Sequence, residues 1–280
     1  MKAAAALIII LMAVSAFTVR SYAFYPGEYT KTIVEPEGGV FFNDKGKTYF
    51  YSAEKKIVKN GLRIIDGDVY FLNRDGSVAK DVTMKLYNTE YVFGPDGKAV
   101  IDIVDSVKIP KESEKSEIAH KVDKYCDTVL EKITAKDMTK EEKVTEIYKW
   151  IRSNVGYQAG TEEDPDWYAE AAKGFRRKNG DCYTYWALAQ AFFTRCGIEC
   201  KTIIRNRDSN HYWHLVKVDD GNWYHVDCTP RSWHCETCLL TDKELLDLSA
   251  EKDYPPFEFA LNQYPRTPYE HPGEAADKND

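Results

Sequence analysis

Little in this sequence would hold it in a membrane or bring it to nucleic acid. The longest apolar run, Ala3–Val14, is shorter than the roughly 20 residues that a membrane-spanning helix needs. Acidic residues outnumber basic ones, 45 to 38, and the net charge of −7 argues against nucleic acid as a partner. The chain also has no D-x-D-x-D-G loop of the calcium-binding kind. What is present is a globular composition, long enough at 280 residues for one sizeable domain and a smaller second one.

The N-terminal residues predict export. Lys2 precedes the apolar run, and Ser21-Tyr22-Ala23 offers a small-x-small cleavage site, which is typical of a signal peptide over residues 1–23. An uncleaved anchor stays open, because the apolar run could extend to Val19. We expect a secreted or cell-surface protein that begins near Phe24 and has no membrane contact after cleavage.

The seven cysteines fit this interpretation. An odd number in an exported chain leaves at least one unpaired thiol or implies an intermolecular bridge. If six form three disulfides, Cys182 is the natural candidate for the free thiol, although the sequence does not decide whether the others are oxidised. The cysteines are Cys126, Cys182, Cys196, Cys200, Cys228, Cys235 and Cys238.

The stretch around Cys182 predicts a helix with a thiol in its first turn. Asp181 is a good N-cap, and the apolar residues that follow Cys182 repeat at helical spacing as far as Cys196-Gly197. A thiol at this position faces unpaired backbone N–H groups and the positive end of the helix dipole, and both favour the nucleophilic thiolate. The alternative is a structural cysteine that happens to begin a helix.

The surrounding segments predict an α+β domain. Before Cys182, apolar residues repeat at helical spacing over 118–133, Thr139 and Glu142 form a capping box for a second helix, and a short helix covers Trp167–Lys173. After Gly197 the pattern changes to strands. The predicted strands are Ile198–Arg205, Tyr212–Val218 and Asn222–Asp227, the last two joined by a tight turn.

The last two strands supply a candidate base and a group to orient it. His211 opens one strand and Asp227 closes the next, so a hairpin can bring imidazole and carboxylate side by side. Strand parity puts Trp213 on the face of His211 and His214 on the opposite face. Taken singly, His211 could be a surface residue and Asp227 a turn starter. The backbone N–H of Cys182 is a candidate oxyanion donor.

Residues 24–105 carry an internal repeat. Tyr49, Tyr70 and Tyr91 are 21 residues apart, and Asp75-Gly76 and Asp96-Gly97 recur at the same interval. An aromatic strand, an Asp-Gly turn and a second short strand indicate stacked β-hairpins, with Phe41-Phe42 before Lys45-Gly46 as one further unit. Residues 106–116 are polar and indicate a linker.

Three motifs resemble the transglutaminase-like superfamily of bacterial exported proteins. They are G-D-C-Y-T-Y (180–185), H-Y-W-H-L-V (211–216) and W-Y-H-V-D-C-T-P-R (223–231), and the resemblance covers roughly residues 117–270. It implies a papain-like α+β core with the catalytic triad Cys182, His211 and Asp227. His214 occupies the position at which the family usually has Asn. With no calcium loop present, the calcium dependence of animal transglutaminases is not expected.

The repeats resemble the cell-wall-binding repeats of the choline- and glucan-binding family. That resemblance implies a wall polymer as a partner. However, the family builds its cages from Trp, and all six Trp of this chain lie at position 150 or later, which makes choline binding through cation–π cages doubtful. A wall contact and a plain spacer both stay open.

A Cys/His cluster near the C-terminus has ligand types that suit zinc. We favour disulfides there, because export favours them and structural zinc sites usually pair two close-spaced ligand couples. We therefore expect no metal and no cofactor. The cluster comprises His225, Cys228, His234, Cys235 and Cys238.

Together these features predict an exported two-part enzyme. A signal peptide (1–23), a hairpin-repeat region (24–105), a linker (106–116), a transglutaminase-like domain (117–270) and a disordered tail (271–280) follow one another. The predicted chemistry is acyl transfer from a carboxamide or peptide through a Cys182 thioester, with a thiolate–imidazolium pair that persists at pH 6. Transamidation and hydrolysis stay open, as do a protease or amidase acting on wall peptides, an inactive binding or adhesion module, and a disulfide-stapled surface protein.

Overall fold

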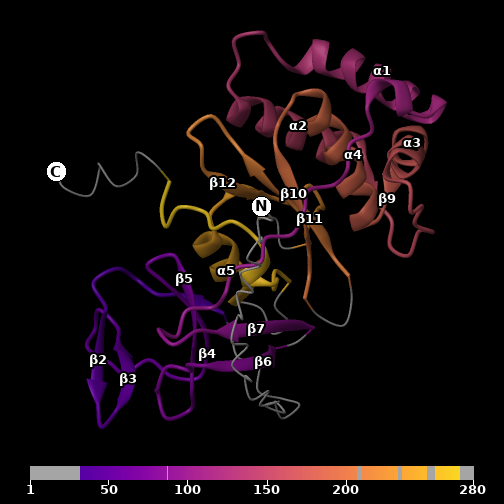
Figure 1. Ribbon diagram of the computed structural model, residues 1–280. Helices are drawn as coiled ribbons and strands as arrows, with labels where there is room; N and C mark the ends of the chain where they lie inside the picture. The colour runs from indigo at the N-terminus through magenta and orange to yellow at the C-terminus, as the bar shows by residue number, and fades with distance from the viewer. Residues whose placement is uncertain (1–31, 87, 207–209, 233–234, 251–255, 272–280) are drawn as a thin grey trace, which may run out of the picture.

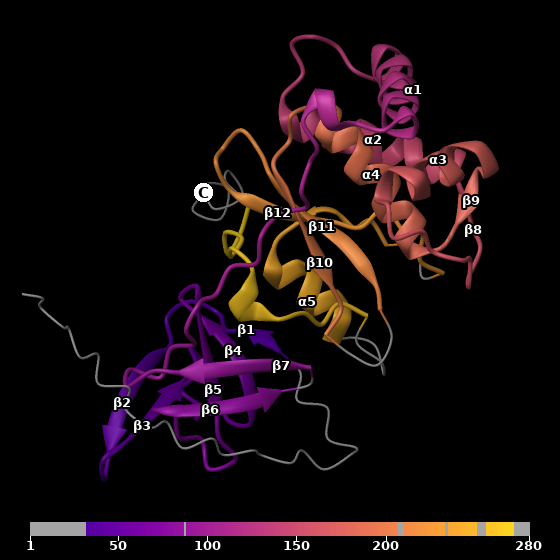
Figure 2. The same ribbon diagram turned by 45° about the vertical axis from the view of Figure 1, so that its right-hand side comes forward.

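The computed structural model describes residues 32–86, 88–206, 210–232, 235–250 and 256–271. The predicted signal peptide and nearly all of the predicted tail lie outside these residues. Figures 1 and 2 show the arrangement: helices on one side, a central sheet, and hairpins at the far end. Among the described residues, no helix is long and apolar enough to cross a membrane. The predicted α+β class is confirmed.

The central sheet has the strand order β10-β11-β12-β13 and is antiparallel throughout. Its strands are β10 (Cys200–Ile204), β11 (Tyr212–Lys217), β12 (Trp223–Val226) and β13 (Cys238–Leu240). The first three were predicted to within two residues. β13 was not predicted, because three residues are too few to show the apolar–polar alternation of a strand.

Four helices cover one face of the sheet. Side chains from every second position of the strands, such as Val216 of β11 and Val226 of β12, pack with these helices in one hydrophobic core. α4 runs through the middle of this cluster, with ten of its 14 residues buried, as expected for a helix that is apolar nearly all round. The helices are α1 (Glu117–Ile133), α2 (Lys140–Asn154), α3 (Trp167–Arg177) and α4 (Cys182–Arg195). Thr139 and Glu142 form the predicted capping box at the start of α2.

The repeats fold into three hairpins of five-residue strands. They are β2 (Val40–Asp44) with β3 (Lys47–Tyr51), β4 (Gly61–Ile65) with β5 (Asp68–Leu72), and β6 (Val82–Leu86) with β7 (Thr89–Phe93). Tyr49, Tyr70 and Tyr91 occupy the middle of β3, β5 and β7, which confirms the 21-residue period. A further short strand, β1 (Ile33–Val34), pairs in parallel with β4.

One detail of the repeat differs from the sequence prediction. Each aromatic strand pairs chiefly with the strand before it, and the Asp-Gly turns lie after the hairpins. The segments that follow these turns reach back to the preceding unit, where Val78 N–H donates to Thr48 O (2.7 Å) and Ala99 N–H to Val69 O (2.8 Å). The turns therefore stack one unit on the next. Gly76 and Gly97 adopt φ of +89° and +88°, and a Cβ at either would strike a side chain of the preceding unit.

The second face of the sheet is covered by α5 (Asp242–Ala250), residues 257–264 and the hairpins. Trp213 and Leu215 from β11 share one hydrophobic core with Tyr91 and Phe93 of the last hairpin. Hydrogen bonds join the same parts, since Leu261 N–H donates to the Tyr91 hydroxyl (3.0 Å). The repeats and the sheet are thus packed directly against one another, although 106–116 contains little regular structure beyond the turn η1 (Glu112–Glu114).

This shared core predicts cooperative unfolding. Truncating Phe93 to Ala should cost about 3–5 kcal/mol, because the ring is fully buried. All six Trp lie outside the repeats, so Trp fluorescence in urea reports on the helices and the sheet. We expect Phe93→Ala to lower the urea midpoint of that fluorescence signal.

The matched control is Phe50→Ala. Phe50 is also buried, but its core cluster contains residues of the repeats alone. It should move the fluorescence midpoint less than Phe93→Ala does. Equal midpoints for wild type and Phe93→Ala would mean that the two parts unfold independently.

Candidate active site

Cys182 is the first residue of α4, and the sequence around it determines that start. Asp181 caps the helix, its carboxylate accepting from the N–H groups of Tyr183 (3.1 Å) and Thr184 (3.4 Å). Gly180 is needed because a Cβ there would collide with the side chain of Thr184, whose hydroxyl is held by buried Glu170 (2.6 Å). The predicted N-cap is confirmed.

The Cys182 sulfur lies beside the start of β11. It accepts a hydrogen bond from the backbone N–H of Tyr212, the residue after His211. The rings of Tyr183 and Tyr212 also meet there, 5.0 Å apart. The thiol is half-buried. The sulfur is therefore held beside the residue that follows His211 in the chain.

His211 and Asp227 are hydrogen-bonded as the sequence predicts. His211 Nε2 lies 2.9 Å from Asp227 Oδ2, and both side chains are buried. Thr229 N–H donates to the other carboxylate oxygen (2.9 Å). A carboxylate only accepts, so Nε2 carries the proton and Nδ1 keeps a free lone pair.

Arg231 completes the environment of the carboxylate, and sequence reasoning gave it no role. Its Nη2 donates to Asp227 Oδ2 (2.6 Å) and also contacts His211 Nε2, because both groups converge on one oxygen. Its guanidinium lies over the ring of Phe257, 4.8 Å from the centroid. The one sequence feature that could have indicated a role for Arg231 is its position as the last residue of the W-Y-H-V-D-C-T-P-R motif, four residues after Asp227.

The charges of these groups follow from their burial. Burial raises the pKa of Asp227, but His211 and Arg231 outweigh it and hold that pKa well below its ordinary value. Burial lowers the pKa of His211, and Arg231 lowers it further, although Asp227 opposes both. Asp227 is therefore ionised and His211 neutral at pH 7.

The thiol responds in the opposite way to the sequence-based expectation. Burial raises the pKa of Cys182 to about 11, with the carboxylate of Asp181 adding to it and the N–H of Tyr212 opposing it. The predicted thiolate–imidazolium pair is thus not favoured in the resting protein. Desolvation of the thiolate is the largest cause of this shift, and it could not be read from the sequence, which shows only that the thiol begins a helix.

His214 lies on the opposite face of β11, as parity predicts. It is buried against α4, with Nε2 3.3 Å from Gln190 Oε1 and its ring stacked on Trp186. Burial lowers its pKa to about 3. The structure therefore brings His211, and not His214, to Asp227.

Tyr157 is a second neighbour that the sequence did not indicate. It lies on β8 (Gly156–Tyr157), which pairs with β9 (Asn179–Gly180) immediately before Cys182. Its side chain is 53% exposed. Burial of part of the ring raises its phenol pKa, and Cys182, Asp181 and Asp227 all add to the shift. These two-residue strands are too short to recognise from sequence.

The C-terminal Cys/His cluster does not gather into a metal site within the described part of the chain. No group of three His, Cys, Asp or Glu residues there could hold a metal ion, and His234 lies outside that part. Both ring nitrogens of His225 already contact protein groups. All seven cysteines are free thiols, so the favoured disulfides are not formed in this structure.

Comparison with known proteins identifies the region that contains these residues. Residues 127–228 match the family model described as the transglutaminase-like superfamily, whose members are typically cysteine enzymes. No curated protein matches the chain.

Several solved structures resemble parts of the chain. An alternansucrase in complex with isomaltononaose is 26% identical over 24% of this chain and 5% of its own, with a TM-score of 0.22. A choline-binding domain from Streptococcus pneumoniae is 21% identical over 22% of this chain and 92% of its own (TM-score 0.21). A candidate cysteine protease from Cytophaga hutchinsonii is 17% identical over 54% of each chain (TM-score 0.33). The chain thus spans about half of the last protein and a small part of the first.

The family match includes Cys182, His211 and Asp227 and extends from α1 to the end of β12. It does not include the hairpins, α5 or the C-terminal segment. The match therefore identifies residues 127–228 as a transglutaminase-like domain.

Proposed function

We propose that this protein is a thiol acyltransferase in which Cys182 is the nucleophile, His211 the base and Asp227 the group that orients the base. The hydrogen bond between His211 and Asp227, at the point where β11 begins beside the Cys182 sulfur, carries the proposal. The match of residues 127–228 to the transglutaminase-like family model supports it.

The proposed reaction begins from a neutral pair. His211 Nδ1 takes the proton of the Cys182 thiol as the sulfur attacks the carbonyl carbon of a carboxamide or peptide. The oxyanion of the tetrahedral intermediate is stabilised by the Cys182 N–H, which has no partner among the described residues. The C–N bond then breaks, and the amine leaves with the proton from His211. A thioester remains.

The second half returns the enzyme to its starting state. An amine or water loses a proton to His211 and attacks the thioester carbon. The C–S bond then breaks, and the departing sulfur takes that proton from His211, which restores the thiol and the neutral imidazole. An amine acceptor gives transamidation, and water gives hydrolysis. Asp227 stays ionised throughout and stabilises the imidazolium that forms twice in each cycle.

A second proposed function belongs to the hairpins, namely contact with a wall polymer at the cell surface. Phe42 stacks on Tyr51 (4.3 Å) and Tyr49 (5.3 Å) on one face of the β2–β3 hairpin, and all three rings are partly exposed. Neighbouring Val40 is 59% exposed. These four residues belong to none of the hydrophobic cores described above. Exposed apolar surface of this kind supports a binding face.

Substitution of Cys182 tests the proposed nucleophile. With casein and wall fragments as acyl donors and a labelled primary amine as acceptor, Cys182→Ala should lower turnover by at least about 10³-fold, because no thioester can form. Cys196→Ala, a matched loss of a half-buried thiol at the other end of α4, should keep turnover. Amine incorporation would assign a transamidase, and new termini or ammonia a hydrolase. Full activity of Cys182→Ala would refute the mechanism.

The pH dependence of Cys182 alkylation tests the charge of its thiol in the resting protein. Since burial keeps the Cys182 pKa near 11, the thiolate fraction should rise about tenfold per pH unit between pH 6 and 8, and iodoacetamide labelling of Cys182 should rise with it. Mass spectrometry measures labelling at this position, and Cys182→Ala gives the background from the other six thiols. A rate that stays flat from pH 6 to 8 would instead indicate the thiolate–imidazolium pair.

Substitution of Tyr51 tests the proposed wall contact of the aromatic face of the β2–β3 hairpin. Tyr51→Ala should weaken co-sedimentation with purified cell-wall sacculi, because it removes one ring of the stack. Thr48→Ala, on the same strand but the opposite face, is the control and should sediment like wild type. Equal binding by both variants would exclude this face as the wall contact.

A further inference from the structure

A second buried histidine–carboxylate pair lies beyond the proposed active site. His225 Nε2 is 2.8 Å from Asp242 Oδ1, and both residues are almost fully buried. Asp242 begins α5, and His225 lies on β12. No hydrogen bond or ion pair among the described residues joins either of them to Cys182 or Asp227, so the reaction proposed above does not use this pair directly.

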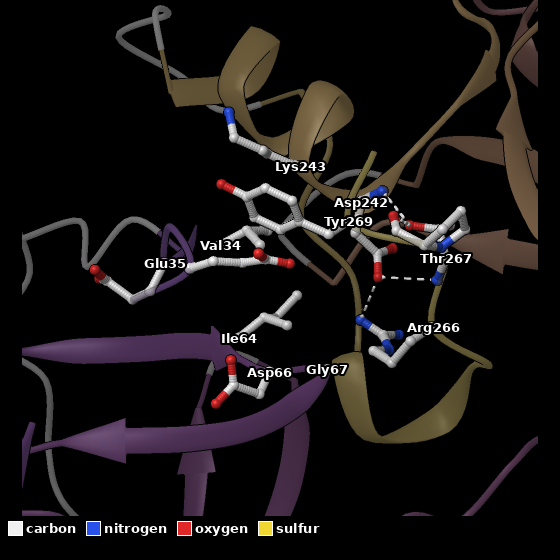
Figure 3. Close-up of a pocket in the computed structure, with 12 residues that line it drawn as sticks. Val34, Glu35, Ile64, Asp66, Gly67, Asp242, Lys243, Arg266, Thr267 and Tyr269 are labelled. Carbon is white, nitrogen blue, oxygen red and sulfur yellow. Dashed lines mark hydrogen bonds and ion pairs between the residues drawn. The ribbon is translucent and has the colours of Figure 1, made fainter. Parts of the chain in front are cut away.

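Asp242 is fixed by the C-terminal segment. Figure 3 shows it beside Arg266 and Thr267 on the wall of a pocket between the hairpins and α5. Arg266 Nη1 is 3.2 Å from Asp242 Oδ2, and the N–H of Asp242 donates to the Thr267 hydroxyl (2.6 Å). Burial raises the pKa of Asp242, but Arg266 and His225 outweigh it and keep the carboxylate ionised.

The hydrogen-bond chemistry determines the tautomer of His225. Trp213 Nε1–H, which can only donate, is 3.1 Å from His225 Nδ1. Nδ1 must therefore be unprotonated, and Nε2 carries the proton that is donated to Asp242. Burial also lowers the pKa of His225, which agrees with a neutral ring.

Trp213 carries this constraint to the active site. Its indole stacks on the imidazole of His211 with centroids 5.6 Å apart and planes at 24°. Phe257 packs against both rings, 5.7 Å from Trp213 and 6.2 Å from His211. The charged groups that act on His211 are Asp227, Arg231 and Arg205. The plane of His211 is therefore set by Asp227 at one side and by the Trp213 indole at its face.

We propose that His225 is a positioning residue for His211: by accepting the Trp213 N–H while donating to Asp242, it fixes the indole against which the imidazole of His211 is stacked. The inference rests on the proposed role of His211 as the base. A buried histidine that is merely structural would affect stability alone. A positioning residue affects the orientation and titration of His211 and the chemical step, while substrate binding stays the same.

Two substitutions at His225 separate these cases. His225→Phe keeps the ring and removes both nitrogens, so the indole loses its acceptor. His225→Gln keeps an acceptor for Trp213 and a donor for Asp242. We expect His225→Phe to lower kcat about 10- to 100-fold with KM nearly unchanged, and His225→Gln to recover most of that loss.

The matched control is His214→Phe, the same change at an equally buried histidine on the opposite face of β11. The pKa of His211, followed by NMR of the histidine side chains, should shift in His225→Phe and stay at the wild-type value in His214→Phe. Wild-type kcat and His211 titration in His225→Phe would overturn the proposal, as would a His225→Gln variant impaired as strongly as His225→Phe.

The tautomer of His225 in the unmodified protein gives a test that no folding defect can obscure. Long-range ¹H–¹⁵N correlation at pH 7 should show the proton on Nε2 alone. A proton on Nδ1, or on both nitrogens, would overturn the proposal. Neither NMR measurement needs turnover, so a Cys182→Ala result that refutes the enzyme mechanism leaves this arrangement of His225, Trp213 and His211 separately testable.

Discussion

The central sheet is buried on both faces, and most of the structure depends on that constraint. Alternate residues of β11 and β12 enter two different cores, one with α1–α4 and one with α5 and the hairpins. A histidine on such a strand has no water to hydrogen-bond, so it needs protein partners. His211, His214 and His225 each have one, and each partner comes from a different part of the chain.

The two faces separate the chemistry. On the helix side, α4 brings Cys182 to the end of β11 and holds His214 as a neutral packing residue. On the hairpin side, His211, Trp213 and His225 form a connected group between two ionised carboxylates. Each carboxylate is also paired with an arginine, Asp227 with Arg231 and Asp242 with Arg266. Removing one member of a buried charge pair typically costs about 3–5 kcal/mol, because the other member stays buried without a partner. The geometry around His211 is therefore stiff, which suits a base that must meet a thiol and a substrate.

The hairpins belong to this arrangement, since their last unit closes the core beneath Trp213. A flexible tether would need no contact with the sheet. Here Tyr91 and Phe93 are as buried as any residue of the sheet, and backbone hydrogen bonds join residues 102–104 to residues 262–263. A polymer held on the outer face of β2–β3 would consequently be held at a fixed place relative to Cys182.

The sequence by itself determined the features that depend on near neighbours: the caps at Asp181 and Thr139, the 21-residue period, and the strand parity that separates His211 from His214. These follow from local hydrogen bonds and from side-chain alternation. Only the tertiary structure decided which strand each aromatic repeat pairs with, that Arg231 shares the carboxylate of Asp227, and that Trp213 links His211 to His225. It also decided the environment of Cys182, because the burial that raises the pKa of its thiol comes from packing that the local sequence does not show.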